Sequence, residues 1–322
     1  MSSSTLSGES SKKNSTIQSR RSRNNSLTSG HRACQGCGEA LGARCAIDAA
    51  YHAAAGKITV VNATGCLEVF SCSFPENAWN VPWLHSLFGN AAAVATGVAA
   101  ALHSQGKEDV RVIAQGGDGA TGDIGMGCLS GMFDRNDDVL YICYDNQAYM
   151  NTGVQRSGTT PPLARTATTV PHKNYAGSDP QTGKNVAQIA MAHEIPYVAT
   201  ASIGNIQDLE KKVSKAINIR GSKYVHVHVP CPLGWGYDTA ETIKIARLAI
   251  QCGLFPLFEA EYGKLARSTA IEDPISIEDY LKPQKRFAHL FGKNASSESL
   301  DILRKIANSN IEKYRLGKTA DD

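Results

Sequence analysis

The sequence predicts a doubly wound α/β fold built on a mostly parallel sheet. An apolar, β-branched run at 110–114 leads into the glycine-rich turn GGDG, and a short helix-like segment follows at 124–133. A second apolar run, 139–144, completes a strand–helix–strand unit, whose two strands should be parallel neighbours. Asp118 and Asn146 then stand just past the carboxyl ends of these strands, where open α/β sheets bind ligands.

Alternating helix and strand patterns extend over most of the chain. Helices are expected over 41–55, 186–193, 206–219, 239–252 and 296–314, and strands over 58–62, 197–201 and 224–229. We expect the Thr/Pro/Gly-rich segment 155–184 to be an active-site cover or a subunit contact, because long loops within compact domains are usually functional or disordered. The segment 283–290 is predicted to be irregular, and the last helix is expected to dock on the domain itself.

The amino-terminal region differs from the rest in composition. Residues 1–30 are rich in Ser, Asn, Thr and Arg with few large apolar side chains, so they are predicted to be a disordered tail. Their Arg/Ser-rich character also resembles an organellar targeting peptide, but an amphipathic stripe is missing, so a flexible extension of a cytoplasmic protein is favoured. The predicted organisation is this tail, a main domain over 31–291, and a helical extension over 292–322.

Charge and composition exclude several classes of protein. The chain has 322 residues, 42% of them apolar, and a net charge of +3. Residues 1–33 hold six Lys or Arg and one Glu, so the remainder carries about −2 and does not suit nucleic-acid binding. The longest mostly apolar run, 91–102, is too short to span a bilayer. Nine cysteines without a convincing secretory signal indicate reduced thiols, some of them possible metal ligands.

Asp118 and Asn146 are the candidate cation ligands. A carboxylate and an amide oxygen beside glycine-exposed N–H groups and a helix N-terminus suit a diphosphate held through Mg²⁺. Taken alone, GGDG fits equally an ordinary strand-to-helix turn with a capping Asp. The position of Asn146 just past the neighbouring parallel strand favours the cation site.

Four cysteines are candidate ligands of an iron–sulfur cluster. Cys34 and Cys37 form a C-x-x-C pair, which by itself fits zinc, a redox pair or one edge of a cluster. Cys66 follows Gly65 after a strand, and Cys231 lies between two prolines after another strand. Four thiolates on glycine- or proline-rich loops are enough for one [4Fe–4S] cube. The other five are interpreted as small buried apolar residues: Cys45, Cys72, Cys128, Cys143 and Cys252.

The combination of motifs resembles a known family. GDG with its distant asparagine resembles the thiamine-diphosphate signature. Together with the cysteines it resembles the β subunits of the 2-oxoacid:ferredoxin oxidoreductases, and among them those acting on pyruvate. The likeness covers about residues 31–291 and includes HRACQGCGE, NATGCLEVF, VPWLHSLFGNAAAVATG, YDNQAYMNTGVQRS and PCPLGWG.

The resemblance implies cofactors and site residues. Thiamine diphosphate would be held through Mg²⁺ bound by Asp118, Asn146 and the carbonyl of Ala148. The cluster would be a [4Fe–4S] cube on Cys34, Cys37, Cys66 and Cys231. Further positions near the thiamine cofactor in the family are Glu39, Gly65, His85, Gly117, Gly119 and Asn151. Asn151 and Glu39 are the candidate catalytic residues, although from this chain alone His85 is interpreted as a core histidine.

The resemblance also implies an activity and partners. The reaction would be oxidative decarboxylation of pyruvate with coenzyme A to acetyl-CoA and CO₂, or its reverse, with electrons passing to ferredoxin. A second, pyrimidine-binding domain is missing, so α, γ and δ subunits are expected as partners and this chain alone is expected to be inactive. No nucleic acid or membrane partner is expected.

Several alternative functions remain open from the sequence. Other substrates are 2-oxoisovalerate, indolepyruvate and oxalate, but the segment YMNTG favours pyruvate over 2-oxoglutarate. A non-oxidative thiamine-dependent lyase would leave the four cysteines unexplained. A non-catalytic electron-transfer subunit would leave Asp118 and Asn146 unexplained.

Overall fold

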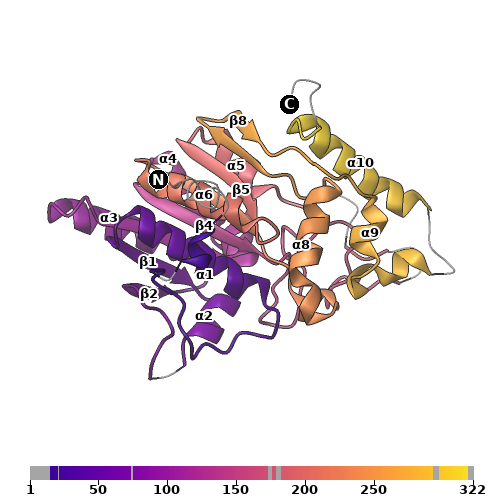
Figure 1. Cartoon of the computed structure of the whole chain (residues 1–322), viewed down its shortest axis with the longest axis horizontal. Helices are drawn as coiled ribbons and strands as arrows, with labels where there is room; N and C mark the ends of the chain where they lie inside the picture. The colour runs from indigo at the N-terminus through magenta and orange to yellow at the C-terminus, as the bar shows by residue number, and fades with distance from the viewer. Residues whose placement is uncertain are drawn as a thin grey trace, which may run out of the picture.

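The computed structural model describes residues 15–20, 22–73, 75–172, 176–178, 183–292 and 297–317. Within these residues the chain forms an eight-stranded sheet of order β2-β1-β3-β4-β6-β5-β7-β8 (Figure 1). All pairs from β2 to β5 are parallel, and only β7 and β8 join antiparallel. The predicted mostly parallel sheet is therefore confirmed. The strands are β1 (Ile58–Ala63), β2 (Trp83–Ser86), β3 (Arg111–Gly117), β4 (Val139–Asp145), β5 (Tyr197–Ser202), β6 (Lys223–His228), β7 (Phe258–Glu261) and β8 (Lys264–Ser268).

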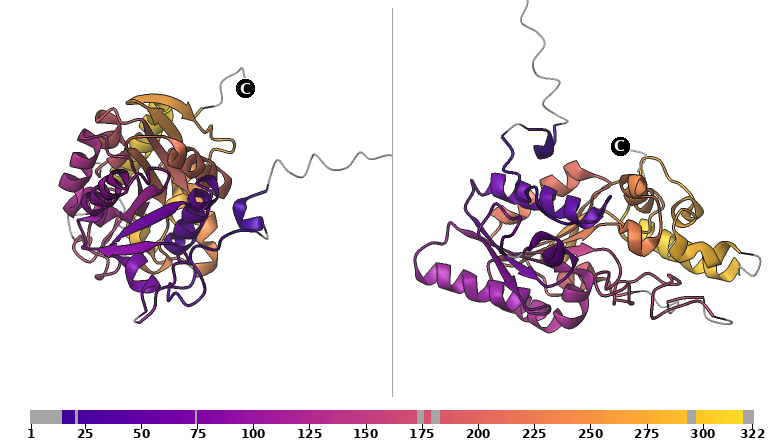
Figure 2. Two further views of the ribbon diagram at one scale, coloured as in Figure 1. Left: turned by 90° about the vertical axis from the view of Figure 1, so that its left-hand side faces the viewer. Right: turned by 90° about the horizontal axis from the view of Figure 1, so that it is seen from below.

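Helices cover both faces of this sheet, as expected for a doubly wound fold (Figure 2). One face packs against α1 (Gly38–Ala53) and α6 (Ile206–Asn218), and the other against α3 (Ala91–Ser104), α4 (Met126–Asp134) and α5 (Val186–Ala192). The central strands β3 and β4 are buried along their length because helices lie on both sides. Two apolar clusters, one on each face, follow from this layering. Among the described residues, none of the helices combines the length and the apolar character that crossing a membrane requires.

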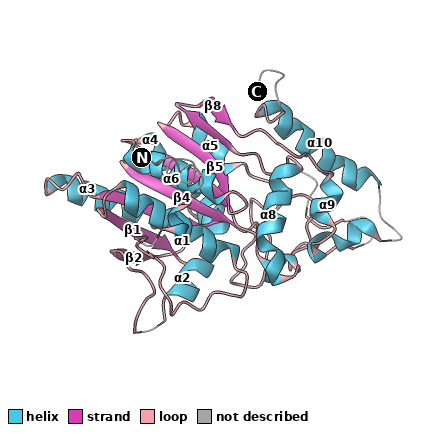
Figure 3. Ribbon diagram, in the orientation of Figure 1, coloured by secondary structure: helices cyan, strands magenta, loops and turns pink. Residues whose placement is uncertain are grey.

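A third apolar cluster lies beside the sheet and is built mainly from the carboxyl-terminal helices (Figure 3). It joins α8 (Thr242–Gln251), α9 (Ile277–Leu281), the 3-10 helix Lys285–Phe291 and α10 (Ser297–Lys313). The expectation that 283–290 is irregular was wrong, because buried Phe287 and Leu290 hold this segment in a helical turn. The final helix docks on the domain as expected, with Leu303 and Ala307 buried.

The strand order creates a switch point between β1 and β3. The chain leaves β1 to form β2 on one side of it, then returns to form β3 on the other side. Connections therefore diverge at the carboxyl ends of β1 and β3, which opens a crevice for a ligand. The helix after β3 begins earlier than predicted, as a π-helical turn at Ala120–Ile124 that leads into α4. Such turns occur frequently at functional sites.

The amino-terminal segment is more ordered than the sequence predicted. Within the residues described, 15–20 and 22–30 pack on the domain, with Leu27 fully buried and Ile17 nearly so. The backbone N–H of Ser26 donates to the Asp48 carboxylate at 2.7 Å, and Leu27 pairs with Trp79 in an antiparallel bridge. Two scattered apolar side chains were too weak a pattern to predict this packing. The predicted disorder of residues 1–14 and 21 lies outside the described residues.

Replacement of Leu27 by Ala tests this packing. A fully buried leucine should lose about 2–5 kcal/mol of unfolding free energy when truncated, because a cavity replaces its side chain. Urea unfolding of the purified protein measures the change, and Leu87→Ala, at a leucine that is 73% exposed, is the matched control. Equal unfolding free energies for Leu27→Ala and the unsubstituted protein would show that the segment does not pack in solution.

Candidate functional site

A cavity of about 180 Å³ lies at the carboxyl ends of the central strands. It opens where β1, β3 and β4 end, next to the switch point of the sheet. Its lining contains all of the predicted cofactor-binding residues except His85. The lining residues are Glu39, Thr64, Gly65, Cys66, Phe88, Gly117, Asp118, Gly119, Ala120, Asn146, Ala148, Tyr149, Met150, Asn151 and Thr152.

Asp118 and Asn146 lie on neighbouring parallel strands, as predicted. Gly117 of β3 pairs with Tyr144 of β4, so the chain leaves both strands at the same edge. The Asn146 side chain is 5% exposed and donates through Nδ2 to Glu39 Oε2 at 3.2 Å. Its Oδ1 is buried and has no hydrogen-bond partner within the described part of the chain. An unpaired buried acceptor is costly, and a cation would satisfy it.

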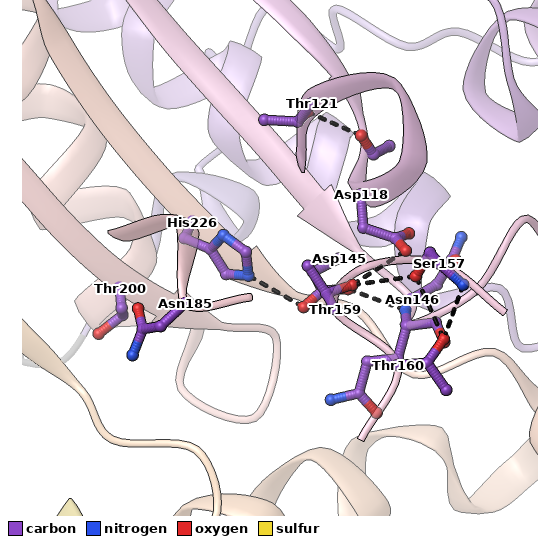
Figure 4. Close-up of polar contacts among 12 residues, drawn as sticks. Asp118, Thr121, Asp145, Asn146, Ser157, Thr159, Thr160, Asn185, Thr200 and His226 are labelled. Atoms are coloured by element: carbon purple, nitrogen blue, oxygen red, sulfur yellow. Dashed lines mark hydrogen bonds and ion pairs between the residues drawn. The ribbon is translucent and has the colours of Figure 1, made fainter. Parts of the chain in front are cut away.

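The Asp118 carboxylate lies in an electrostatically unfavourable environment. It is 2% exposed, and burial followed by the neighbouring Asp145 carboxylate raises the pKa of Asp118 well above its ordinary value. Hydrogen bonding by Ser157 opposes this shift, as does the Thr159 hydroxyl, which contacts Asp118 Oδ2 (Figure 4). A divalent cation would favour the ionised carboxylate far more strongly than these hydroxyl groups do.

The donor atoms fit a hard cation such as Mg²⁺. A carboxylate, an orphan amide oxygen and a nearby backbone carbonyl are oxygen ligands of the kind that Mg²⁺ takes from proteins. The carbonyl of Ala148 accepts one hydrogen bond, from the N–H of Met150 at 2.9 Å, so one lone pair remains. These three residues can therefore hold the metal, and phosphate and water oxygens would complete its octahedron.

Gly119 is required by close packing rather than by an unusual backbone angle. Its φ is −66°, but a Cβ on this residue would overlap the ring of Tyr149. The Tyr149 hydroxyl donates to Asp123 Oδ2 at 2.6 Å, and this carboxylate also accepts from the N–H of Gly158 at 2.8 Å. The absence of a side chain at Gly119 therefore lets Tyr149 form one wall of the cavity. Asp123 connects Tyr149 to the loop at Gly158.

Glu39 lies at the floor of the cavity on the first turn of α1. It is 3% exposed, and burial raises its pKa to about 7 despite hydrogen bonds from Asn146 and from the backbone of Leu67. The same carboxyl raises the pKa of the Cys37 and Cys66 thiols, in each case after burial as the larger cause. Glu39 therefore lies between the oxygen donors and the cysteines.

The four predicted cluster cysteines come from three separated segments of the chain. Cys37 caps the N-terminus of α1, and its sulfur accepts from the N–H of Ala40 at 3.4 Å. Cys66 opens α2 (Cys66–Ser71), so it begins a helix, contrary to the loop that the sequence predicted. Cys231 caps α7 (Pro232–Trp235) and accepts from Gly234 at 3.3 Å. Cys34 lies on the exposed turn before Cys37.

These thiols lie close enough to influence one another. Cys34, Cys37 and Cys231 each contribute to raising the pKa of Cys66, and Cys34 contributes to that of Cys231. Within the described residues no three His, Cys, Asp or Glu side chains converge tightly enough to hold a single metal ion. A cube is larger than one ion, because each of its irons takes one cysteine. N–H groups at helix starts favour the thiolate form that a cluster requires.

Two contacts join the oxygen donors to the Cys231 loop. The indole N–H of Trp235, four residues after Cys231, donates to the carbonyl of Asn146 at 2.8 Å. Met150 packs against Gly234 so closely that a Cβ there would overlap its sulfur. The segment that contains Asn146 and Met150 is therefore held in a fixed position relative to the loop that carries Cys231.

His85 and two of the cysteines are more exposed than the sequence predicted. His85 lies on the short edge strand β2, exposed, so its interpretation as a core histidine was wrong. Its Nε2 is 2.8 Å from the hydroxyl of Thr64, which lines the cavity. Asn151 is exposed at the cavity mouth. Cys45, Cys143 and Cys252 are buried as predicted, but Cys72 and Cys128 are only partly buried.

Sequence reasoning missed a polar network beneath Asp118. Asp145, the last residue of β4, and Ser157 and Thr159 from the long loop are all buried beside it. Asp145 directly precedes Asn146, so its acidic side chain after a fully buried strand was a usable signal. The loop residues carried no periodic signal, and only the folded chain shows that 157–160 turn inward.

Glu39→Gln should change how stability depends on pH. The folded carboxyl keeps its proton up to a pKa of about 7, and the unfolded one loses it near 4.5. Stability from the protonated group is therefore complete below pH 4.5 and lost as pH rises through 7. The variant should gain on the order of 3 kcal/mol relative to the unsubstituted metal-free protein between these pH values. Urea unfolding at both pH values measures this, and a pH-independent difference would contradict it.

Comparisons with known proteins identify the family. The model of the thiamine pyrophosphate enzymes' C-terminal TPP binding domain matches residues 63–227. Pyruvate synthase subunit PorB of Methanosarcina barkeri is 47% identical over 291 residues, which cover 90% of this chain and 97% of that protein. Ketoisovalerate oxidoreductase subunit VorB of Pyrococcus abyssi is 40% identical, over 86% of this chain and 88% of that protein.

A solved structure supports the fold independently. A 2-oxoglutarate:ferredoxin oxidoreductase from Magnetococcus marinus superposes with a TM-score of 0.54 at 21% identity, covering 90% of this chain and 96% of that chain. The sheet, the cavity at the ends of β1, β3 and β4, and the relatives all point to one family. This chain is a thiamine-diphosphate-type α/β protein that belongs to the PorB-type β subunits of the 2-oxoacid:ferredoxin oxidoreductases.

Proposed function

We propose that this chain is the β subunit of an oxidoreductase that converts pyruvate and coenzyme A to acetyl-CoA and CO₂, or runs the reverse reaction. Electrons would pass through a [4Fe–4S] cluster to ferredoxin. The observation that carries the proposal is the position of Cys66, which lines the same cavity as Asp118 and Asn146. A cluster on this cysteine would therefore lie at the wall of the cofactor cavity, within reach for electron transfer.

Thiamine diphosphate is the cofactor that the cavity would hold through Mg²⁺. Asp118, Asn146 and the Ala148 carbonyl would supply the metal's protein oxygens, and N–H groups of the turn after Gly119 would bind the diphosphate. When bound, this cofactor supplies the carbanion and the electron sink needed for loss of CO₂ from a 2-oxoacid. The chain's own groups bind the metal, orient the diphosphate, and place Asn151 at the mouth where a substrate would enter.

Glu39 has a defined place in this arrangement. It is buried between Asn146 and the cysteines, and it contacts Asn146 directly. It therefore satisfies the amide nitrogen, which leaves Oδ1 as the unpaired atom of the amide. We retain Glu39 and Asn151 as candidate catalytic residues, the first beside the metal donors and the second at the substrate entrance.

The site needs partner subunits to be complete. Its volume of about 180 Å³ is below the roughly 300–1,000 Å³ usual for pockets that enclose a drug-sized ligand. Apolar side chains near the mouth are strongly exposed, with Leu87 at 73% and Ile124 at 61%. Both would be buried if an α subunit carrying the pyrimidine-binding domain and its activating glutamate covered this edge. Subunits of γ and δ type would complete the complex and lead electrons onward.

Pyruvate is the substrate that the relatives favour. The relative from Methanosarcina barkeri is named for pyruvate, and the one from Pyrococcus abyssi for ketoisovalerate. The higher identity to the former and the segment YMNTG next to the metal donors favour pyruvate. 2-Oxoisovalerate, indolepyruvate and oxalate are the alternatives that an assay must separate.

The complex purified anaerobically with its partner subunits tests the function. We expect absorbance of an iron–sulfur cluster in the β subunit, with about four irons per β chain. Viologen reduction should require coenzyme A and be fastest with pyruvate among the 2-oxoacids named above. A colourless, iron-free β subunit that still releases CO₂ from pyruvate would indicate a thiamine-dependent lyase instead.

Asp118→Ala separates the two proposed centres. The variant should lose thiamine diphosphate on gel filtration, because the metal loses its carboxylate ligand, yet keep its iron. Cys66→Ser is the reciprocal variant and should lose iron. Cofactor content is measured by fluorescence after oxidation to thiochrome diphosphate and iron by chelation. Loss of both groups from Asp118→Ala would identify Asp118 as a folding residue rather than a ligand.

A further inference from the structure

We propose that Thr159 is a positioning residue whose hydroxyl, held against the Asp145 carboxylate, sets the orientation of Asp118 and thereby the affinity for the metal. The inference rests on the proposed magnesium site and deepens it. It also assigns a role to the long segment 155–184, part of which turns inward beside Asp118 and Asp145 (Figure 4).

Thr159 bridges two buried carboxylates (Figure 4). Its Oγ1 lies 3.0 Å from Asp118 Oδ2 and 2.9 Å from Asp145 Oδ1, and its one O–H proton can be donated to only one of the two carboxylates at a time. Asp118 and Asp145 are 2% and 4% exposed and Thr159 is 8% exposed, and Asp145 and Thr159 also line a second cavity of about 480 Å³. Buried acceptors depend on the few donors placed beside them.

Asp145 is held from its other side by N–H donors. Gln147 donates its backbone N–H to Oδ1 at 2.8 Å, and His226 Nε2 lies 2.9 Å from Oδ2. Since Nε2 donates to the carboxylate, Nδ1 accepts from the hydroxyl of Tyr224 at 2.7 Å. Asp145 is therefore supplied with N–H donors without Thr159, which leaves the single O–H proton of Thr159 for Asp118.

The same carboxylate also shapes the backbone between the other two metal donors. Gln147 stands between Asn146 and Ala148 and has a φ of +66°, an uncommon conformation for a residue other than glycine. Its N–H is held by Asp145, and its carbonyl accepts from the hydroxyl of Thr160 at 2.7 Å. Adjacent threonines of one loop therefore support the donors on both strands.

The loop that carries Thr159 is anchored independently of the metal donors. The N–H of Gly158 donates to Asp123 at 2.8 Å, and Lys184 reaches the same carboxylate and the carbonyl of Gly122 at 2.6 and 2.7 Å. Ser157 donates its N–H to Thr160 Oγ1 at 2.9 Å. The backbone at Thr159 is thus anchored, which limits how far its hydroxyl can follow Asp118 if the carboxylate rotates. Such outer groups typically contribute 10–100-fold to metal affinity.

Thr159→Val tests the inference because it removes the hydroxyl and keeps the shape. In the assembled complex with thiamine diphosphate, binding of Mn²⁺ as the Mg²⁺ analogue is followed by the electron paramagnetic resonance of free Mn²⁺, without turnover. The dissociation constant should rise about 10–100-fold. Thr159→Ser, which keeps the hydroxyl, should restore binding. Iron content and subunit composition should remain unchanged in both variants.

Thr166→Val is the matched control. Thr166 lies in the same loop and is 5% exposed, and within the described part of the chain its hydroxyl contacts Thr168 and Thr169 rather than the metal donors, so its replacement should leave the Mn²⁺ dissociation constant unchanged. If Thr159→Val does not assemble, Thr159→Ala provides the same measurement with less bulk. Equal Mn²⁺ affinity in the unsubstituted complex and in Thr159→Val or Thr159→Ala overturns the positioning role. Absence of Mn²⁺ binding in the unsubstituted complex overturns the proposed metal site itself.

Discussion

The parallel pairing of β3 and β4 is the constraint on which the site depends. Parallel neighbours end at the same edge, so the residues that follow them, Asp118 and Asn146, enter one cavity although 28 positions separate them. A shift of one residue in this register would turn every side chain of one strand to the opposite face. The long apolar stretches of both strands prevent such a shift, since each is buried against helices on two sides.

Burial of charge is the cost of placing the site at this edge. Asp118, Asp145 and Glu39 are all nearly inaccessible to water, and the first two are close neighbours. Each unpaired buried carboxylate would be strongly unfavourable, so hydroxyl and N–H donors surround them. An orphan oxygen on Asn146 remains within the described structure, and a cation would relieve both deficits together. Metal binding would therefore stabilise the buried polar groups around the cavity.

Much of the fold could be predicted because its signals are local. Long strands such as β3 and β4 have continuous apolar patterns, and both were located to within two or three residues. Strands β2, β7 and β8 were missed because four or five residues carry too little pattern, and β7 and β8 depend on pairing with β5 and with each other. The packing of Leu27 was missed for a related reason, since a single apolar side chain in a polar tail has no periodicity.

The candidate site also contains some residues that could be predicted from local sequence patterns and others that could not. The sequence alone pointed to the candidate cation donors and the candidate cysteine ligands, because Asp118 and Asn146 follow recognisable strands and the cysteines stand beside glycine or proline. Only the tertiary structure decided which loop lies beneath them and where His85 points. Thr159 approaches Asp118 through a segment without periodicity, and its position depends on contacts made far along the chain. Local patterns encode strands and turns, whereas hydrogen bonds between distant loops exist only after the sheet has formed.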